Sequence, residues 1–246
     1  MEQLLNIKEA ARILHVTETT IRRWTNTGLL NCYRIGRKRE RRFKMEDLKQ
    51  YLLSVNDHFN RQSAHLGYKD LDVPGGAHVA HLSLDEAESL EIGVAYISKG
   101  LQLGETVLIV APVQKAESLL TALNERGAYS DANLKSGLLR VSAGMDSPAS
   151  QIAYIARNAE DARGGLRLFS AMVWMKQKGW SPADMRKLED STGAIPFDGV
   201  NLLLCQYTLE SFPAATAMMA METHEYTLYK GALVASPYIR KSDLAA

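Results

Sequence analysis

Seven basic residues and one glutamate fall within eleven positions in the stretch RIGRKRERRFK, residues 34–44. A run of this kind is a solvated charged surface, part of a disordered tail, or a surface that meets a polyphosphate. Residues 1–56 carry twelve Lys or Arg against six Asp or Glu, a net charge of +6, and the remainder carries seventeen against twenty-two, a net charge of −5. This asymmetry predicts an anionic partner for the N-terminal segment.

Two predicted helices precede the basic run. Asn6 with Glu9 three residues later is a helix-start signal, and a second start follows at Thr17. The first helix has a buried stripe at helical spacing, formed by Ile7, Ala10, Ala11 and Leu14. The second helix carries a polar and cationic stripe at the same spacing, formed by Thr19, Arg22, Arg23 and Asn26. Two short helices with such a stripe predict a helix-turn-helix whose second helix reads base edges.

The basic run follows this pair as a predicted two-stranded hairpin with its turn at Gly36, before a closing helix around Leu48. A cationic hairpin tip beside a groove-reading helix is typical of the wing of a winged helix-turn-helix, which binds phosphates. The predicted phosphate contacts are Arg37, Lys38, Arg39, Arg41 and Arg42. A merely solvated hairpin is the weaker interpretation, because Arg22 and Arg23 share the sign of its charge.

The segments NIKEAARILHVTETTIRRWTNTGLL, YRIGRKRERRF and DLKQYL resemble the excisionase-type, MerR-related DNA-binding domain over residues 3–53. The resemblance implies double-stranded operator DNA as a partner. No long helix follows to form the dimerisation coiled coil of true MerR proteins. We nevertheless expect a homodimer, because one head of this size makes a small interface with DNA.

Residues 57–76 are polar and end in Pro-Gly-Gly, which is typical of a linker after a first domain over residues 1–56. Beyond it, strand-like segments at 79–84, 106–111, 138–143, 166–173 and 200–206 alternate with helical patterns at 85–101, 114–126, 148–163, 182–190 and 214–221, and a hairpin closes the chain. This alternation predicts a three-layer α/β domain over residues 77–246, with a mainly parallel sheet covered on both faces.

Ligands of such a sheet bind at the carboxyl ends of its strands. Side chains expected near these ends predict a mostly apolar small-molecule site lined by His81, Trp174, Cys205, Tyr207 and His224. Cys205 as a small buried hydrophobe and His224 as a core histidine remain structural alternatives. His78 and His81 are three apart in one strand and face opposite sides, so they cannot share a metal, and no metal site is predicted.

The segment GLQLGETVLIVAPVQKAES is similar to the start of a RecA-like core. A phosphate loop needs convergent glycines, a lysine and a Ser or Thr hydroxyl. Here Lys115 is present, but the glycines are missing and Ala116 stands in place of the hydroxyl. We therefore expect neither nucleotide hydrolysis nor a cofactor.

The segments HVAHLSLDEAE, GLQLGETVLIV, SAMVW, LLLCQY and THEYTLYKG resemble the MEDS domain, the DcmR-like sensory domain, over about residues 76–239. That domain is a degenerate relative of RecA/KaiC-type domains. The resemblance implies a RecA/KaiC-like fold with a degenerate phosphate loop and a sensor of small organic molecules. This chain reads CQYT where family forms often read CQYD, so it lacks a carboxylate at position 208.

The two resemblances predict a one-component, repressor-like transcriptional regulator with a small-molecule effector, and not an enzyme. We expect it in the cytoplasm and not at a membrane, because the chain has no bilayer-spanning apolar run, no secretory signal and only two cysteines. One alternative is a nucleotide- or thiol-dependent enzyme, the latter using Cys205 with His81 or His224 as its spatial partner. The other is an architectural DNA binder whose C-terminal domain only oligomerises.

Overall fold

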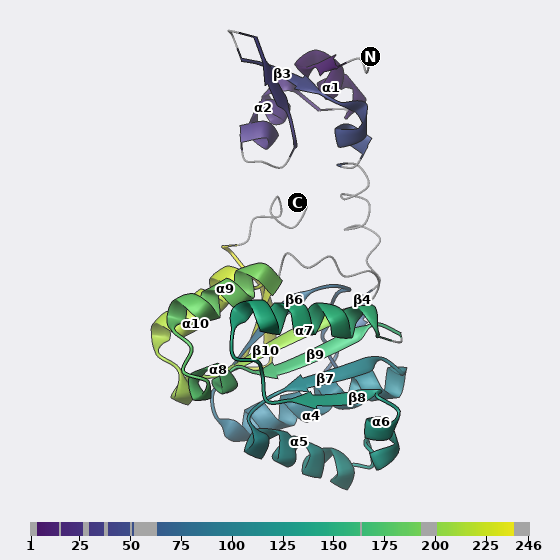
Figure 1. The fold of residues 1–246 in the computed structure, drawn as a ribbon, viewed down its shortest axis with the longest axis vertical. Helices are drawn as coiled ribbons and strands as arrows, with labels where there is room; N and C mark the ends of the chain where they lie inside the picture. The colour runs from purple at the N-terminus through teal and green to yellow at the C-terminus, as the bar shows by residue number, and fades with distance from the viewer. Residues whose placement is uncertain are drawn as a thin grey trace. The chain divides into compact units, whose positions relative to one another are not determined.

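The computed structural model describes residues 4–14, 16–26, 30–36, 39–49, 51, 63–162, 164–192 and 201–238 (Figure 1), without the side chains of Arg23 and Asn26. The chain divides into two compact units, one within residues 1–60 and the other in residues 61–239. We call them the head and the body and describe each by itself. Within the described residues, no helix combines the length and the hydropathy that a membrane span requires.

The head contains the two predicted helices, α1 (Ile7–Ile13) and α2 (Glu18–Asn26). The predicted start signals are confirmed. The Asn6 side chain accepts hydrogen bonds from the backbone N–H groups of Lys8 and Glu9, and the Glu9 carboxylate accepts one from the Asn6 backbone at 2.7 Å. At α2 the Thr17 hydroxyl accepts from the Thr20 backbone at 3.2 Å. Local side-chain chemistry therefore sets where both helices begin.

The head sheet has three strands in the order β1-β3-β2, namely β1 (Leu5–Asn6), β2 (Tyr33–Ile35) and β3 (Glu40–Phe43). The predicted hairpin is confirmed as β2 and β3. The short β1 was not expected, and it forms because Leu5 pairs with Phe43. Residues 45–49 are helical, and their Leu48 packs into the core of the head with Ile21 and Phe43, all three fully buried.

The body is built on a seven-stranded sheet in the order β12-β11-β6-β10-β9-β7-β8. Its strands are β6 (His78–Ser83), β7 (Thr106–Val110), β8 (Leu139–Ser142), β9 (Leu166–Ala171), β10 (Leu202–Thr208), β11 (Tyr226–Tyr229) and β12 (Ala232–Ala235). Every neighbouring pair is parallel except β11 with β12. The strand pairing confirms the prediction of a mainly parallel α/β sheet. The prediction succeeded because strands that are continuously apolar must be covered on both faces.

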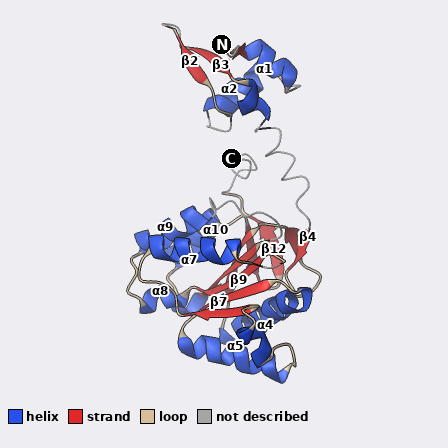
Figure 2. Ribbon diagram, turned by 45° about the vertical axis from the view of Figure 1, so that its right-hand side comes forward, coloured by secondary structure: helices blue, strands red, loops and turns tan. Residues whose placement is uncertain are grey.

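Helices cover both faces of this sheet. Figure 2 shows α4 (Glu86–Leu103) and α5 (Val113–Glu125) on one side, and α7 (Pro148–Glu160), α9 (Pro182–Thr192) and α10 (Ala214–Thr223) on the other. Two short helices were not predicted, α6 (Asp131–Lys135) and α8 (Val173–Gln177). As a result Trp174 lies in α8 and not at the end of the preceding strand, which stops at Ala171.

Part of the segment expected to be a linker belongs to the body. Residues 63–74 form a hairpin of β4 (Ser63–His65) and β5 (Asp72–Pro74). Its apolar side chains Ala64, Leu66 and Val73 are buried in the core on the α4 side of the sheet. The polar composition of the segment hid these three side chains, and the compact body begins at residue 61 instead of 77.

Candidate functional site

Two polar clusters lie on opposite faces of β10, at the CQY segment singled out in the sequence. Successive side chains of a strand point to opposite faces. Cys205 and Tyr207 therefore lie in the core beneath α9 and α10, whereas Gln206 hydrogen-bonds to Ser89 of α4 on the other face. Three consecutive residues thus serve both clusters, with Cys205 and Tyr207 on one face of β10 and Gln206 on the other.

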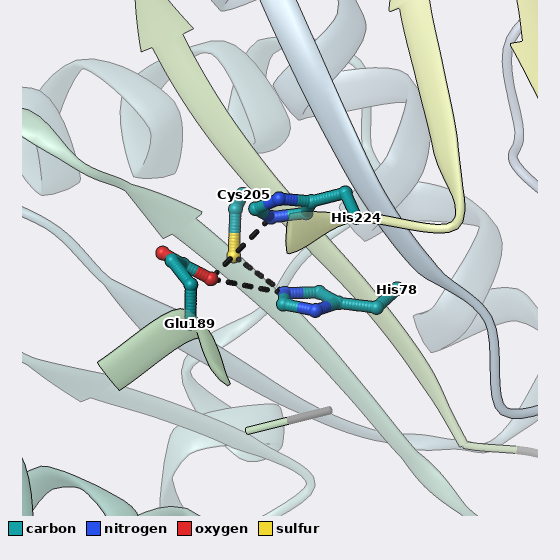
Figure 3. Close-up of side chains that lie close together, drawn as sticks. All are labelled: His78, Glu189, Cys205 and His224. Carbon is teal, nitrogen blue, oxygen red and sulfur yellow. Dashed lines mark hydrogen bonds and ion pairs between the residues drawn. The ribbon is translucent and has the colours of Figure 1, made fainter. Parts of the chain in front are cut away.

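The first cluster consists of His78, Glu189, Cys205 and His224, and we call it the Cys-His-Glu cluster. Figure 3 shows their side chains converging from β6, α9, β10 and the residue that follows α10. His78 Nε2 lies 3.3 Å from Cys205 Sγ and 3.3 Å from Glu189 Oε2. His224 Nε2 lies 3.4 Å from the same carboxylate oxygen. One ligand atom from each residue lies within 4.8 Å of all the others, and all four residues are buried.

Neighbouring groups hold these side chains in place. The Ala220 carbonyl lies 2.8 Å from His224 Nδ1 and accepts its proton, which leaves the lone pair of the ring on Nε2. The Tyr207 hydroxyl donates to Glu189 Oε1 at 2.7 Å and leaves Oε2 facing both imidazoles. The His78 and His224 rings pack with centroids 3.9 Å apart. The carboxylate and both rings are therefore oriented towards one point.

Burial and mutual proximity shift the protonation of the cluster. Burial, with the nearby His78, lowers the pKa of His224 to about 3, so this ring is neutral at pH 7. Burial raises the pKa of Glu189, but the two histidines and the Tyr207 hydroxyl outweigh it and hold the carboxyl below its ordinary range. Burial and the Glu189 charge raise the pKa of the Cys205 thiol. The buried thiol is therefore a poor nucleophile, because the thiolate is the reactive form.

The second cluster lies on the α4 side, and we call it the switch-point network: His81, Glu86, Ser89, Lys115 and Gln206. β6 stands between β10 and β11, and the chain leaves it through α4 on one face while α10 leads into β11 on the other. This reversal of direction is the topological switch point, where open α/β sheets bind ligands. The network therefore occupies the position at which a ligand is expected.

Hydrogen bonds connect the whole network. The Lys115 ammonium donates to Glu86 at 2.6 Å and to the Ser89 hydroxyl at 2.7 Å. The Gln206 amide donates to His81 Nδ1 at 2.9 Å, so the proton of this ring sits on Nε2. Burial, followed by the Lys115 charge, lowers the pKa of His81 to about 3 and keeps the ring neutral. Among the described residues, the buried His81 Nε2 has no hydrogen-bond partner.

The switch point does not fit a phosphate group. The turn from β6 into α4 contains Leu84 and Asp85 and no glycine. The first turn of α4 carries Glu86 and Glu88, whose negative charges occupy the helix end that would otherwise attract a phosphate. Lys115, the lysine of the RecA-like segment, follows a different strand, β7, and is already paired with Glu86. The turn from β6 into α4 therefore disfavours a phosphate group.

The five predicted ligand-site residues fall into three places. Cys205, Tyr207 and His224 meet in or beside the Cys-His-Glu cluster. His81 lies on the opposite face of the sheet, as its spacing from His78 predicted. Trp174 is buried elsewhere on the α9 side, where its indole donates to the Ser170 hydroxyl at 3.1 Å and packs edge-on against Trp180. These five residues do not line a single site.

Two members of the Cys-His-Glu cluster were missed in the sequence. His78 cannot share a metal with His81, but it meets Cys205 of the neighbouring strand. Glu189 lies on the buried stripe of α9 with Met185, Leu188 and Thr192. A carboxylate on the apolar face of a helix is rare unless it is paired, and this was the signal in the sequence.

The side chains predicted to contact DNA differ in their exposure and in their partners within the head. Thr19 and Arg22 are exposed on α2, where Arg22 lies 3.4 Å from Glu18 one turn earlier. Arg39 is exposed in the hairpin turn, and Arg42 pairs with Glu40 at 2.8 Å. Arg41 instead turns inward and donates to the Thr25 hydroxyl of α2 at 2.8 Å, which joins the wing to the helix. Arg37, Lys38 and the side chains of Arg23 and Asn26 lie outside the described residues.

Comparison with known proteins agrees with this division of the chain. Residues 4–55 match the family model described as a helix-turn-helix domain. Residues 77–225 match the model of MEDS, the methanogen/methylotroph, DcmR sensory domain. A head that binds DNA and a body of the sensory class define a DNA-binding transcriptional regulator with a sensory domain. The MEDS match covers more than half of the chain, and the protein belongs to the MEDS family.

The chain is similar along most of its length to the transcriptional repressor DcmR of Methylorubrum extorquens. The two share 26% identity over 244 residues, covering 92% of this chain and 91% of the repressor. Among solved structures, the flagellar accessory protein FlaH from Methanocaldococcus jannaschii aligns with a TM-score of 0.46 at 11% identity over 65% of this chain and 76% of its own. The ATP synthase subunit NeqB from Nanoarcheaum equitans aligns with a TM-score of 0.43 at 12% identity, over 69% and 50%.

Proposed function

We propose that this protein is a repressor-like, one-component regulator whose body binds a small organic effector and thereby changes the affinity of the head for an operator. The observation that carries the proposal is the buried His81 Nε2–H at the switch point, which no described group accepts. A buried donor without a partner is costly, and an effector with an acceptor atom would remove that cost.

The head supports the DNA part of this proposal. Arg22 and Thr19 are exposed on α2, on the stripe that also contains positions 23 and 26. We assign base-edge reading to this stripe and phosphate binding to Arg39 and Arg42, together with positions 37 and 38 of the turn. Arg41 supports the wing indirectly through its bond to Thr25. The double-stranded operator is thus held by two adjacent surfaces of one small domain.

The body supports a sensor rather than an enzyme. The Cys205 thiol is buried, and Glu189 meets the same imidazole nitrogen of His78 that faces the sulfur. A nucleophilic triad instead needs the carboxylate on the other ring nitrogen. The carboxylates at the start of α4 disfavour a nucleotide. We propose a RecA/KaiC-like body that has lost its phosphate loop and keeps the switch point for a small neutral ligand.

Selection of genomic DNA fragments on the purified full-length protein tests the proposal. We expect a specific fragment to be enriched. A fluorescence-anisotropy screen with small alcohols and amides, which carry an acceptor atom, should identify a compound that shifts its affinity by about 5–150-fold. The variant His81→Gln should keep its affinity for the fragment and lose the shift, whereas His65→Gln should keep both. If no DNA fragment is enriched, the proposed regulator function is wrong. If the effector still shifts the DNA affinity of His81→Gln, the assignment of the effector site to His81 is wrong.

A further inference from the structure

We propose that the Cys-His-Glu cluster is a binding site for one divalent transition-metal ion of the zinc class, held by His78 Nε2, Glu189 Oε2, Cys205 Sγ and His224 Nε2. The site lies on the face of the sheet opposite to the switch-point network. It rests on the geometry of these four residues and is independent of the proposed effector site.

The spacing of the four ligand atoms fits a tetrahedral ion. Zinc binds nitrogen, oxygen and sulfur donors at about 2.0–2.3 Å, so that neighbouring donors of a tetrahedral site stand roughly 3.3–3.8 Å apart. The three recorded separations, from His78 Nε2 to Cys205 Sγ, from His78 Nε2 to Glu189 Oε2 and from His224 Nε2 to Glu189 Oε2, are 3.3, 3.3 and 3.4 Å. Three of the six donor pairs therefore already stand at ligand spacing, and all six lie within 4.8 Å.

The donor types select the class of metal. Two imidazoles, a thiolate and a carboxylate form a mixed set of borderline, soft and hard donors, and zinc and its neighbours in the first transition row bind all three kinds. Calcium and magnesium require six or more oxygen ligands, and this cluster offers a single free carboxylate oxygen. With four protein donors the site is closed, as in structural zinc sites.

The surroundings of the ligands also match those of a metal site. Ligating histidines commonly donate their second ring N–H to a carbonyl, and ligating carboxylates are themselves hydrogen-bonded. His224 donates to the Ala220 carbonyl, and Glu189 Oε1 accepts from Tyr207. His224 is fully buried, and its Nε2 aims at the cluster without a hydrogen-bond partner among the described residues. Its lone pair thus faces a carboxylate oxygen, which is an arrangement that a cation would stabilise.

A bound ion would connect four separate parts of the body. His78 begins β6, Cys205 lies within β10, Glu189 comes from α9, and His224 directly follows α10. The ion would therefore hold α9 and the end of α10 onto the central strands. Since such a site is assembled only in the folded chain, metal binding contributes to the stability of the fold.

Metal analysis of the tag-free, full-length protein, purified without chelators, is the first test. Inductively coupled plasma mass spectrometry should find about one transition-metal ion per chain. After removal of that ion, added Co²⁺ should produce the visible bands of tetrahedral cobalt and a thiolate-to-cobalt charge-transfer band in the near ultraviolet. A wild-type protein that is purified without metal and develops neither band with Co²⁺ overturns the proposal.

Matched variants locate the site. Cys205→Ser should lose the charge-transfer band, whereas Cys32→Ser, which alters the other cysteine of the chain, should keep it. His224→Gln should weaken Co²⁺ binding by more than about 10–100-fold, the loss that removal of an outer-sphere partner alone causes, and His65→Gln should not. An unchanged charge-transfer band in Cys205→Ser overturns the assignment.

A second variant keeps the test decisive if the ligand variants do not fold. Tyr207→Phe keeps all four ligands and removes only the hydroxyl that donates to Glu189 Oε1. We expect it to retain the charge-transfer band and to bind Co²⁺ about 10–100-fold more weakly than the wild-type protein. Binding of wild-type strength in Tyr207→Phe would show that Glu189 is not a ligand and would overturn the four-residue site.

Discussion

At the residue scale, the arginines of the head have different surroundings. Arg22 is on the exposed face of α2, and its side chain is 55% exposed. Arg42 lies on the outer face of β3 beside Glu40, whereas Arg41 points inward to Thr25. Neighbours in one basic run therefore have different roles, because alternate side chains of a strand face opposite sides.

These positions predict two different losses of DNA binding. Arg22→Ala should cost about 1–3 kcal/mol on the selected fragment and relax its sequence preference, since a base contact discriminates among bases. Arg42→Ala should weaken binding to all sequences and reduce the salt slope by about 1, the signature of one lost phosphate contact. Anisotropy titrations at several salt concentrations measure both effects, with Arg126→Ala in the body as control. An unchanged salt slope in Arg42→Ala would contradict its assignment to a phosphate.

His81 predicts a measurable dependence of stability on pH. Its pKa is lowered to about 3 in the folded body by burial and by Lys115, with Glu86 also in the network. Below about pH 6.5, His81 is therefore protonated in the unfolded chain but stays neutral in the folded chain. The free energy of unfolding falls as the pH drops below this value, because protonation stabilises the unfolded chain. Between pH 7.5 and 5 this histidine should account for a loss of about 2 kcal/mol.

Urea unfolding of the wild-type protein and of His81→Gln at pH 7.5, 6 and 5 measures this contribution. The glutamine side chain can still accept the hydrogen bond from Gln206 and does not titrate. We expect the variant to lose about 2 kcal/mol less than the wild-type protein over this range. Equal losses in both proteins would mean that His81 is accessible to protons in the folded state.

At the scale of elements, a buried ion pair joins the β4–β5 hairpin to the sheet. Arg167 of β9 is fully buried, and its guanidinium donates to Glu105 at 2.5 and 3.3 Å and to the His65 carbonyl of β4 at 3.1 Å. Gly100 of α4 allows this arrangement, because a Cβ at that position would lie 2.5 Å from the Arg167 side chain. A single arginine of β9 is thus bonded to Glu105, directly before β7, and to β4.

Removal of the partner charge should destabilise the body strongly. Glu105→Gln leaves the Arg167 charge buried without its counter-ion, and a broken buried pair costs about 3–5 kcal/mol. Chemical denaturation followed by circular dichroism measures the change, and Glu125→Gln, at an exposed position of α5, is the control. A loss similar to that of the control would mean that water reaches the pair.

At the scale of the whole molecule, the head determines how the protein meets DNA. A single head of this size makes a small interface with DNA. We expect two chains to bind together, so that the operator contains two half-sites about 10–10.5 base pairs apart or a multiple of that spacing. Native mass spectrometry of the protein with its selected fragment should detect two chains per duplex. A single chain that protects one half-site would contradict the expected homodimer.

Local patterns in the sequence accounted for most of the elements. Asn6 with Glu9 and Thr17 with Thr20 form the predicted helix starts, and the five apolar runs of the body form parallel strands. These features depend on side chains a few residues apart, so periodicity and capping chemistry are sufficient to predict them. The sequence did not predict the β4–β5 hairpin, because only three of its side chains are buried and the rest of the segment is polar.

The sequence by itself determined a DNA-binding head, a parallel α/β body and the opposite orientations of His78 and His81. Only the tertiary structure decided that His78 meets Cys205, 127 residues away, together with Glu189 and His224. It likewise brought Lys115 to Ser89 and Arg41 to Thr25. The physical reason is that strand order and helix crossovers bring distant residues together, and neither leaves a periodic signal within one segment of the chain.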